Sequence, residues 1–206
     1  MHLKRQKTTT KLPIPRKGTK YIARALSDIK TSVSVVMAVR DMLKLAKTTA
    51  EVKRMIHQKL LKINGRLVKD HRESIKLFNI FEADKTYILT LLPTRKFALE
   101  ETKNKDIRPC KVINKTLTKN NVLQLNLHDG SNVISKDKIS VGDTLYLDLS
   151  GKIKKHIALD KGKEALIILG KYIGLKGKIK SVENNLIEIS FEDKSAILNK
   201  RQAIAL

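Results

Sequence analysis

The sequence predicts an α+β protein made of several small modules. Three observations lead to this class: helical periodicity is confined to residues 34–59, residues beyond 93 form short alternating segments separated by turns, and the first 33 residues are strongly basic. We therefore expect four regions: a basic N-terminal arm (1–33), a helical hairpin followed by a β-hairpin (34–92), a central small β domain (93–160) and a C-terminal small β-barrel (161–206).

The charge balance indicates the kind of partner. The 206 residues include 43 Lys and Arg against 20 Asp and Glu, a formal charge of +23, and aromatic residues make up only 4%. Such a charge fits a polyanion, and scarce aromatics favour phosphate and shape contacts, as made to folded RNA, over base stacking. The longest apolar runs are five residues, 35–39 and 165–169, too short to span a membrane. No apolar segment follows the N-terminal charges, so we expect no secretory signal.

Cysteine usage narrows the chemistry further. Cys110 is the single cysteine, which excludes an internal disulfide and the zinc patterns that need paired thiolates. The histidines show no metal-ligand spacing with one another or with Cys110, so we expect neither a metal nor a cofactor. The expected compartment is the cytoplasm.

The N-terminal arm carries the densest charge. Residues 1–30 hold nine basic side chains and a single acid, Asp28. Pro13 and Pro15 favour extended backbone, and the segment has little apolar surface to bury. It is expected to be a solvated tail in the free protein, or an arm that orders along RNA phosphates when bound. The candidate RNA-binding residues of the arm are Lys4, Arg5, Arg16, Lys17 and Lys20.

The second region has two helical signals and one tight turn. Val35, Val36, Val39, Met42 and Leu43 form one apolar stripe, and Thr48 followed by Glu51 predicts a capped helix over 50–59. The Asn-Gly pair at 64–65 supplies the positive φ angles of a hairpin turn. If the basic residues of this unit converge on one face, they bind phosphate. Otherwise they are a solvated charged face. The candidates are Arg40, Lys53, Arg54, Lys62, Asn64, Gly65 and Arg66.

The remainder alternates in the manner of antiparallel strands. Strands are expected at 111–117, 122–127, 144–149 and 152–159 in the central domain, and at 165–169, 178–182, 186–191 and 195–198 in the barrel. Turn chemistry separates them, including Asn120-Asn121 and Asn184-Asn185. No period of 20–50 residues recurs, which argues against a solenoid.

Residues 48–65, TTAEVKRMIHQKLLKING, resemble the S4 RNA-binding module: a small polar cap, a glutamate, two basic residues, an apolar pair and a strand that ends at Asn-Gly. Lys59 stands where that module commonly has glycine, so we expect a different join into the strand. The resemblance implies RNA binding. By itself it leaves several classes open, because the module also occurs in tRNA ligases, pseudouridine synthases and stress proteins.

Three glycines, Gly170, Gly174 and Gly177, give the segment 170–179 a resemblance to the KOW motif of small barrels in ribosomal proteins and transcription elongation factors. The resemblance implies a KOW-type barrel, with Lys171, Lys176 and Lys178 facing RNA. A purely structural barrel turn with exposed lysines is the alternative. A dinucleotide site is disfavoured, because it needs a closely spaced Gly-x-Gly-x-x-Gly before a helix, whereas a strand pattern follows here.

Two further segments resemble the ribosomal protein S4e family of archaeal and eukaryotic small subunits: HLKR at 2–5 with PIPRKG at 13–18, and QLNLHDG at 124–130. The order of arm, S4-like module, central β domain and KOW barrel matches as well. The resemblance implies a structural component that binds small-subunit ribosomal RNA beside neighbouring ribosomal proteins, in the cytoplasmic ribosome. It implies no small-molecule substrate and no membrane.

Two other functions remain open on the sequence. The S4 and KOW resemblances, taken separately, fit a free RNA-binding factor in RNA quality control or transcription elongation. An RNA-modifying enzyme would also use an S4 module for targeting, but residues 93–206 offer no credible acid, base or nucleophile. His128-Asp129 is the nearest candidate, and Asp129-Gly130 is more simply a turn. We therefore expect no catalytic residue.

Overall fold

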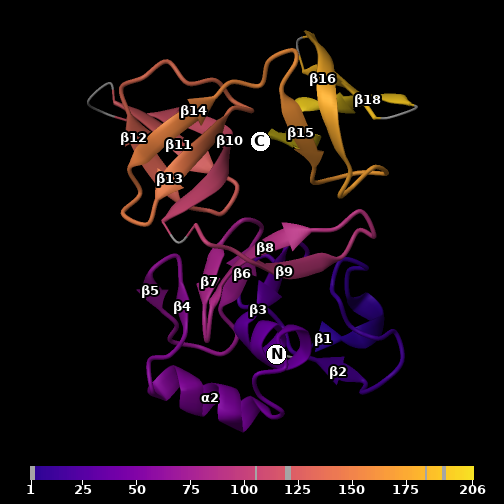
Figure 1. Cartoon of the computed structure of the whole chain (residues 1–206), viewed down its shortest axis with the longest axis vertical. Coiled ribbons are helices and arrows are strands. Elements are labelled where there is room, and N and C mark those ends of the chain that lie inside the picture. The colour runs from indigo at the N-terminus through magenta and orange to yellow at the C-terminus, as the bar shows by residue number, and fades with distance from the viewer. Residues whose placement is uncertain (1–2, 105, 119–121, 184, 192–193) are drawn as a thin grey trace. The chain divides into compact units, whose positions relative to one another are not determined.

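The computed structural model describes residues 3–104, 106–118, 122–183, 185–191 and 194–206, in two compact units that divide after residue 105. The chain is mostly β, with few helices (Figure 1). His2, the predicted Asn120-Asn121 turn and Asn184 of the second predicted turn lie outside the described residues.

The first unit is organised around a five-stranded antiparallel sheet in the order β5-β4-β7-β8-β9. Its strands are β4 (Lys62–Ile63), β5 (Arg66–Leu67), β7 (Ile80–Glu82), β8 (Thr86–Leu91) and β9 (Phe97–Glu101). Strand β9 pairs with β8 from Leu91↔Phe97 to Tyr87↔Glu101, so 97–101 belongs to this unit and not to the central domain to which the sequence assigned it. Phe97 is buried, and its burial holds β9 in the core of the first unit although Glu100 and Glu101 follow it in the chain.

Two helical segments lie beside this sheet. The first is α1 (Val35–Met37) continued by the π-helical η2 (Ala38–Met42), and the second is α2 (Thr49–His57). Of the predicted stripe, Val35, Val36 and Val39 are buried, whereas Met42 and Leu43 are half-buried; Met37 and Ala38, which the stripe did not include, are buried as well. Within α2 only Val52 is fully buried.

The predicted cap of α2 is present. Thr48 Oγ1 accepts a hydrogen bond from the Glu51 amide at 3.3 Å, while Glu51 Oε2 accepts from the Lys47 amide at 2.7 Å. The helix ends at His57 and Gln58 caps it; the next residue, Lys59, has a φ of +59° in the left-handed region, and the Leu60 amide donates to the Met55 carbonyl. This is a Schellman-type ending, with lysine in the position that glycine prefers.

The described part of the predicted arm folds against the first unit, contrary to the expected solvated tail. Strand β1 (Leu3–Lys4) pairs with β2 (Tyr21–Ile22), and β3 (Ser32–Ser34) pairs with β6 (Ser74–Lys76). The Phe97 amide donates to the Lys11 carbonyl at 2.8 Å, and Leu12 is buried. Backbone hydrogen bonds to distant residues therefore hold the arm in place, although its own sequence has few apolar residues to bury.

The second unit contains two five-stranded antiparallel sheets. The first has the order β12-β11-β10-β13-β14. Its strands are β10 (Ile107–Leu117), β11 (Leu123–Leu127), β12 (Asn132–Ser135), β13 (Thr144–Asp148) and β14 (Ile153–Ile157). Its core gathers Cys110, Val112, Leu125, Leu127, Ile139, Leu145 and Leu147. The four predicted strands are confirmed, and β12 is an addition.

The second sheet has the order β18-β17-β16-β15-β19. Its strands are β15 (Glu164–Ile167), β16 (Lys176–Glu183), β17 (Leu186–Ser190), β18 (Ser195–Asn199) and β19 (Ala203–Ala205), with the short 3-10 helix η3 (Lys200–Gln202) before the last. The sequence predicted all but β19. Ile157 and Leu159 at the end of the first sheet pack into this core, so the two sheets share apolar surface.

Candidate nucleic-acid interface

A basic hollow of about 430 Å³ lies in the N-terminal segment. Its lining residues come from β1, from the short 3-10 helix η1 (Arg5–Lys7) and from the loop before β2: Lys4, Arg5, Gln6, Arg16, Lys17, Gly18, Thr19 and Lys20. All five cations proposed for the arm line this one hollow, and no acidic residue lines it. A concave surface with this lining attracts phosphate groups, because its charges add without internal neutralisation.

Arg5 holds the hollow together. Its Nε donates to the Thr19 carbonyl at 2.8 Å, its Nη2 donates to Thr19 Oγ1 at 3.0 Å, and its Nη1 donates to the Pro15 carbonyl at 2.5 Å. Gly18, with φ +142°, passes so close that a Cβ there would lie 2.9 Å from Arg5 Nη2. The Arg5 guanidinium therefore braces the loop, while Lys4, Arg16, Lys17 and Lys20 remain exposed for an external anion.

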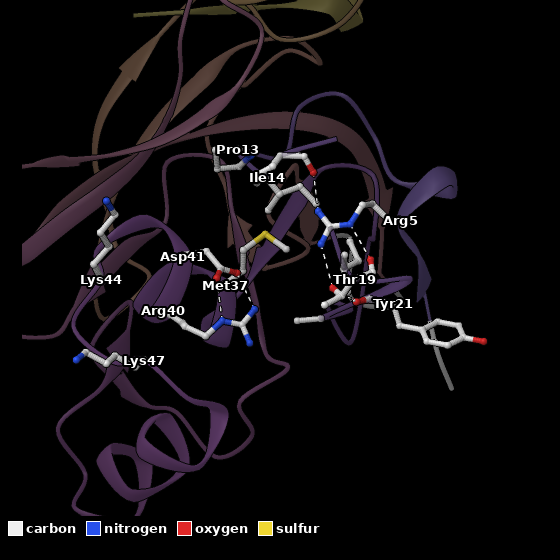
Figure 2. A pocket seen from close by; sticks show the side chains of 13 residues that line it. Arg5, Pro13, Ile14, Thr19, Tyr21, Met37, Arg40, Asp41, Lys44 and Lys47 are labelled. Atoms are coloured by element: carbon white, nitrogen blue, oxygen red, sulfur yellow. Dashed lines mark hydrogen bonds and ion pairs between the residues drawn. The ribbon is translucent and has the colours of Figure 1, made fainter. Parts of the chain in front are cut away.

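A second hollow of about 700 Å³ adjoins the first and shares Arg5 and Thr19 with it. Figure 2 shows Arg5 from the N-terminal segment and Arg40 from η2 on different sides of Met37. Arg40 Nε and Nη2 donate to the two oxygens of Asp41 at 2.8 and 2.9 Å, and this hydrogen bonding raises the pKa of Arg40. Arg40 thus contributes a partly neutralised charge.

Lys44 and Lys47 also line the second hollow, and the sequence analysis missed them. They follow Arg40 by four and seven residues, so helical spacing was the available signal. Lys44 ends the first helical segment in the left-handed region, with φ +57°. The segment 40–47, from which only Arg40 was predicted as a site residue, therefore contributes three basic residues to the lining of the second hollow.

The structure places Lys53 and Arg54 on the exposed side of α2, next to buried Val52. His71 lies near enough to Lys53 to respond to its charge: burial is the main cause that lowers the pKa of His71, and Lys53 adds to the effect. Both cations of α2 are available to an external anion. Arg40 lines the second hollow, and Lys53 and Arg54 do not. A single RNA-facing surface that includes all three therefore stays a prediction.

The Asn-Gly turn forms as expected, with φ +50° at Asn64 and +77° at Gly65. Asn64 Oδ1 accepts from the Ile80 amide at 2.9 Å, so this side chain anchors the hairpin to β7. Two flanking cations have acidic neighbours. Lys62 Nζ lies 3.7 Å from Glu82 Oε2, and Arg66 Nη2 lies 2.6 Å from Glu73 Oε2. Arg66 is 67% exposed and can still present its guanidinium outward.

In the last sheet, Lys176 and Lys178 project from β16 on either side of Gly177, and Lys171 lies in the preceding turn with Nζ 5.8 Å from the centre of the Tyr172 ring. Gly177 is required by close approach, since a Cβ there would lie 2.6 Å from the Ser190 carbonyl oxygen and from Ile189 Cγ2. The three lysines are exposed. Backbone packing thus fixes this glycine, and the lysines beside it remain candidates for RNA contact.

The structure gives His128-Asp129 a structural role. Asp129 forms a buried ion pair with Arg108 and accepts hydrogen bonds from the amide and hydroxyl of Ser131. Burial opposes ionisation of Asp129, but the Arg108 charge and these hydrogen bonds together lower its pKa. His128 Nδ1 accepts from the Lys111 amide at 3.1 Å. This carboxylate is committed to a fixed partner and a turn, so it is not poised for proton transfer.

Two absences apply to the part of the chain that the structure describes. It contains no group of three or more His, Cys, Asp or Glu side chains that could hold a metal ion. It also has no helix long and apolar enough to cross a membrane.

Two adjoining hollows in the first unit, lined by exposed cations, form a surface of the kind that attracts a polyanion. Comparison with known proteins makes the class specific. The family model described as "Ribosomal family S4e" matches residues 83–153. The chain is 32% identical over 198 residues to "Small ribosomal subunit protein eS4" of Methanocaldococcus jannaschii, covering 88% of this chain and 81% of the relative.

Two further relatives agree. The protein of the same name from Methanococcus maripaludis strain S2 is 31% identical over 202 residues, covering 90% of this chain and 83% of the relative. The crystal structure of the 30S ribosomal protein S4e from Thermoplasma acidophilum superposes with a TM-score of 0.74 at 25% identity, covering 86% of this chain and 95% of that one. The chain belongs to ribosomal family S4e.

Proposed function

We propose that this chain is a structural constituent of the small ribosomal subunit, where it binds ribosomal RNA and supports translation. The observation that carries the proposal is the basic hollow, whose five cations come from one folded segment and face no acid in its lining. The relatives named small ribosomal subunit protein eS4 supply the assembly in which such a surface meets RNA.

The finer assignment is also part of the proposal. Residues 34–92 act as an S4-type RNA-binding module and residues 161–206 as a KOW-type barrel, each presenting cations to RNA phosphates. Neighbouring ribosomal proteins complete the environment, in the cytoplasmic ribosome. The proposed RNA-facing residues are Lys4, Arg5, Arg16, Lys17, Lys20, Arg40, Lys53, Arg54, Lys62, Asn64, Gly65, Arg66, Lys171, Lys176 and Lys178.

Cosedimentation tests the assembly. A structural constituent stays with purified small subunits through a high-salt wash, because many contacts hold it at once. A free RNA-binding factor dissociates in the same wash, since its affinity depends on a few phosphate contacts screened by salt. If the protein is lost from washed subunits, it is a free RNA-binding factor and not a structural constituent.

Charge reversal on α2 tests the assignment of residues. The double variant Lys53→Glu/Arg54→Glu removes two cations that are exposed and lie beside, not within, the core. If both contact phosphate, the slope of log affinity against log salt becomes shallower by about 2 in magnitude, at about 0.9 per contact.

The matched control is Lys96→Glu/Lys103→Glu, an equal charge change at two exposed positions of the same unit. Both variants should keep the thermal transition of the natural chain. Equal slopes and equal losses of affinity in the two variants would mean that total charge alone determines binding.

A further inference from the structure

The second hollow differs from the first in its floor. Every side chain that lines the first hollow is basic or polar, apart from Gly18, which has none. The lining of the second hollow adds six apolar residues from the N-terminal segment and from α1: Pro13, Ile14, Pro15, Ile22, Ala23 and Met37. Apolar side chains offer phosphate oxygens no hydrogen bond, whereas they gain when another apolar or aromatic surface covers them. The second hollow therefore offers a surface for a chemical group other than phosphate.

Met37 lies at the bottom of this hollow. It is only 2% exposed, and Figure 2 shows its sulfur between the guanidinium groups of Arg5 and Arg40. Lys44 and Lys47 lie on the other side of Met37 from Arg5 in the same view. The methionine sulfur is polarisable and makes favourable contacts with aromatic rings. An apolar floor with cations on two sides thus suits an aromatic group that carries negative charge at its ends.

Arg40 supplies a planar surface beside Met37. Its Nε and Nη2 donate to the two oxygens of Asp41, at 2.8 and 2.9 Å, so the guanidinium is held in one orientation. The side chain of Arg40 is nevertheless 31% exposed. Nucleobases stack on guanidinium planes as they do on aromatic rings. Tyr21, the single aromatic residue among the described lining residues, extends away from Met37 in Figure 2, so Arg40 is the stacking surface of the hollow.

The two hollows are continuous, because Arg5 and Thr19 line both of them. An RNA strand whose phosphates occupy the first hollow can therefore place an adjacent base in the second. That base must be unpaired, since the bases of a duplex are stacked inside it and cannot lie face down on a concave surface. We propose that the second hollow holds one unpaired base of ribosomal RNA, above Met37 and stacked on the Arg40 guanidinium. This inference rests on the proposed ribosomal function.

The charge of the hollow favours RNA over a protein segment. Four cations line it, Arg5, Arg40, Lys44 and Lys47, and Asp41 is the one acid among the described lining residues. Phosphates on either side of the base would meet Arg5 at one end and the two lysines at the other. A protein segment that covered the same apolar floor would need acidic residues at both ends, and it would leave the guanidinium plane of Arg40 uncovered.

Site-specific crosslinking from the rim of the hollow identifies its occupant. Lys47 is exposed, so Lys47→Cys can carry a benzophenone maleimide. Cys110 is buried, and burial raises the pKa of its thiol to about 12, so the natural cysteine resists the reagent. In small subunits assembled with the labelled full chain, we expect a crosslink to a ribosomal RNA nucleotide that 2′-hydroxyl acylation shows to be unpaired. A crosslink to a paired nucleotide or to a protein, or no crosslink, overturns the inference.

Incorporation separates this result from the proposed function. If neither the natural chain nor the labelled chain enters small subunits, the proposed function fails, and the inference fails with it. If both chains enter, the crosslinked partner decides the occupant of the hollow alone. If only the labelled chain fails to enter, the natural chain decides through the removal of single bases from the RNA.

Replacement of a nucleotide by an abasic residue removes the base and keeps its sugar and phosphate. The RNA is the fragment of small-subunit ribosomal RNA that the natural chain protects from hydroxyl radicals, with each unpaired nucleotide made abasic in turn. At one position the natural chain should lose about tenfold in affinity, because one stacked base is lost. Equal affinity for the abasic and unmodified fragments at every position overturns the inference.

The variant Arg40→Lys keeps the charge of the hollow and removes its planar surface. It should bind the unmodified fragment about tenfold more weakly than the natural chain does, and it should bind the unmodified and abasic fragments about equally, because both changes remove the same contact. The matched control is Arg95→Lys, at an exposed position of the same unit outside both hollows, which should keep the tenfold preference. A tenfold preference that persists in Arg40→Lys would place the base elsewhere and overturn the inference. If Arg40→Lys lacks the thermal transition of the natural chain, the abasic comparison with the natural chain still decides.

Discussion

Lys111 is a buried cation whose removal makes a quantitative test of the packing in the second unit. Its side chain lies between the two sheets, and its Nζ donates to the carbonyls of Lys200, at 2.6 Å, and Ala203. Only 3% of the residue is exposed. Burial lowers the pKa of this ammonium from the 10.5 of an exposed lysine to about 8.

The sign of the pH dependence follows from proton binding. Between about pH 8 and 10.5, the unfolded chain holds the Lys111 proton more tightly than the folded chain does. The free energy of unfolding should therefore rise with pH across this window. At 1.36 kcal/mol per pKa unit, the full gain is about 3 kcal/mol. The variant Lys111→Met lacks the titrating group and should lack this gain.

The assay compares urea unfolding of the natural chain and of Lys111→Met at pH 7.5, 9 and 10.5. The difference in unfolding free energy between them should grow with pH, while titrations of other groups cancel in the subtraction. Nitrogen NMR of the Lys111 side chain gives its pKa directly. A pKa near 10.5, or a difference that stays constant with pH, would refute the burial of a charged ammonium between the sheets.

Three backbone positions give further predictions. Gly177→Ala should lower the unfolding free energy by about 2 kcal/mol, because the added Cβ meets the Ser190 carbonyl at 2.6 Å; an unchanged urea midpoint would contradict this contact. Lys59→Gly should raise it by about 0.5–1 kcal/mol, because glycine adopts φ +59° without strain, and a loss of stability would place the helix end elsewhere. Gly18→Ala should displace the Arg5 side chain from Thr19, because the added Cβ would lie 2.9 Å from Arg5 Nη2. Hydrogen exchange of the Arg5 amide, which donates to the Lys20 carbonyl, should then become faster. An unchanged exchange rate would show that the Arg5 side chain does not hold this loop.

Local signals predicted the elements whose causes are local. The Thr48 cap of α2 and the Asn64-Gly65 turn depend on residues within a few positions of one another, and both form as expected. The alternation of buried and exposed residues located most strands of the second unit for the same reason. The comparison with the S4 module also identified Lys59 as standing where glycine is common, and the structure shows a positive φ at this residue, which glycine adopts more readily.

The candidate interface was predictable in its residues but not in its shape. Charge density marked the N-terminal segment, and four of its five candidate cations stand in the segments 2–5 and 13–18 that resemble the S4e family, but nothing local indicated that Arg5 would brace the loop through Thr19 and Pro15. The pairing of the Lys11 carbonyl with the Phe97 amide joins residues 86 positions apart, so the arm could not be seen to fold. Lys44 and Lys47 were missed because the second hollow exists only once that fold brings η2 to the arm.

By itself, the sequence determined the charge, the cap of α2 at Thr48 and the Asn64-Gly65 turn, since each depends on composition or on neighbours in the chain. Only the tertiary structure decided that β9 belongs to the first unit, that Arg108 and Asp129 form a buried ion pair, and that Lys111 joins two sheets. These contacts depend on which distant segments meet, and a charged residue is tolerated in a core only when a distant partner satisfies it. The pattern of charge along the chain cannot reveal that partner before the fold does.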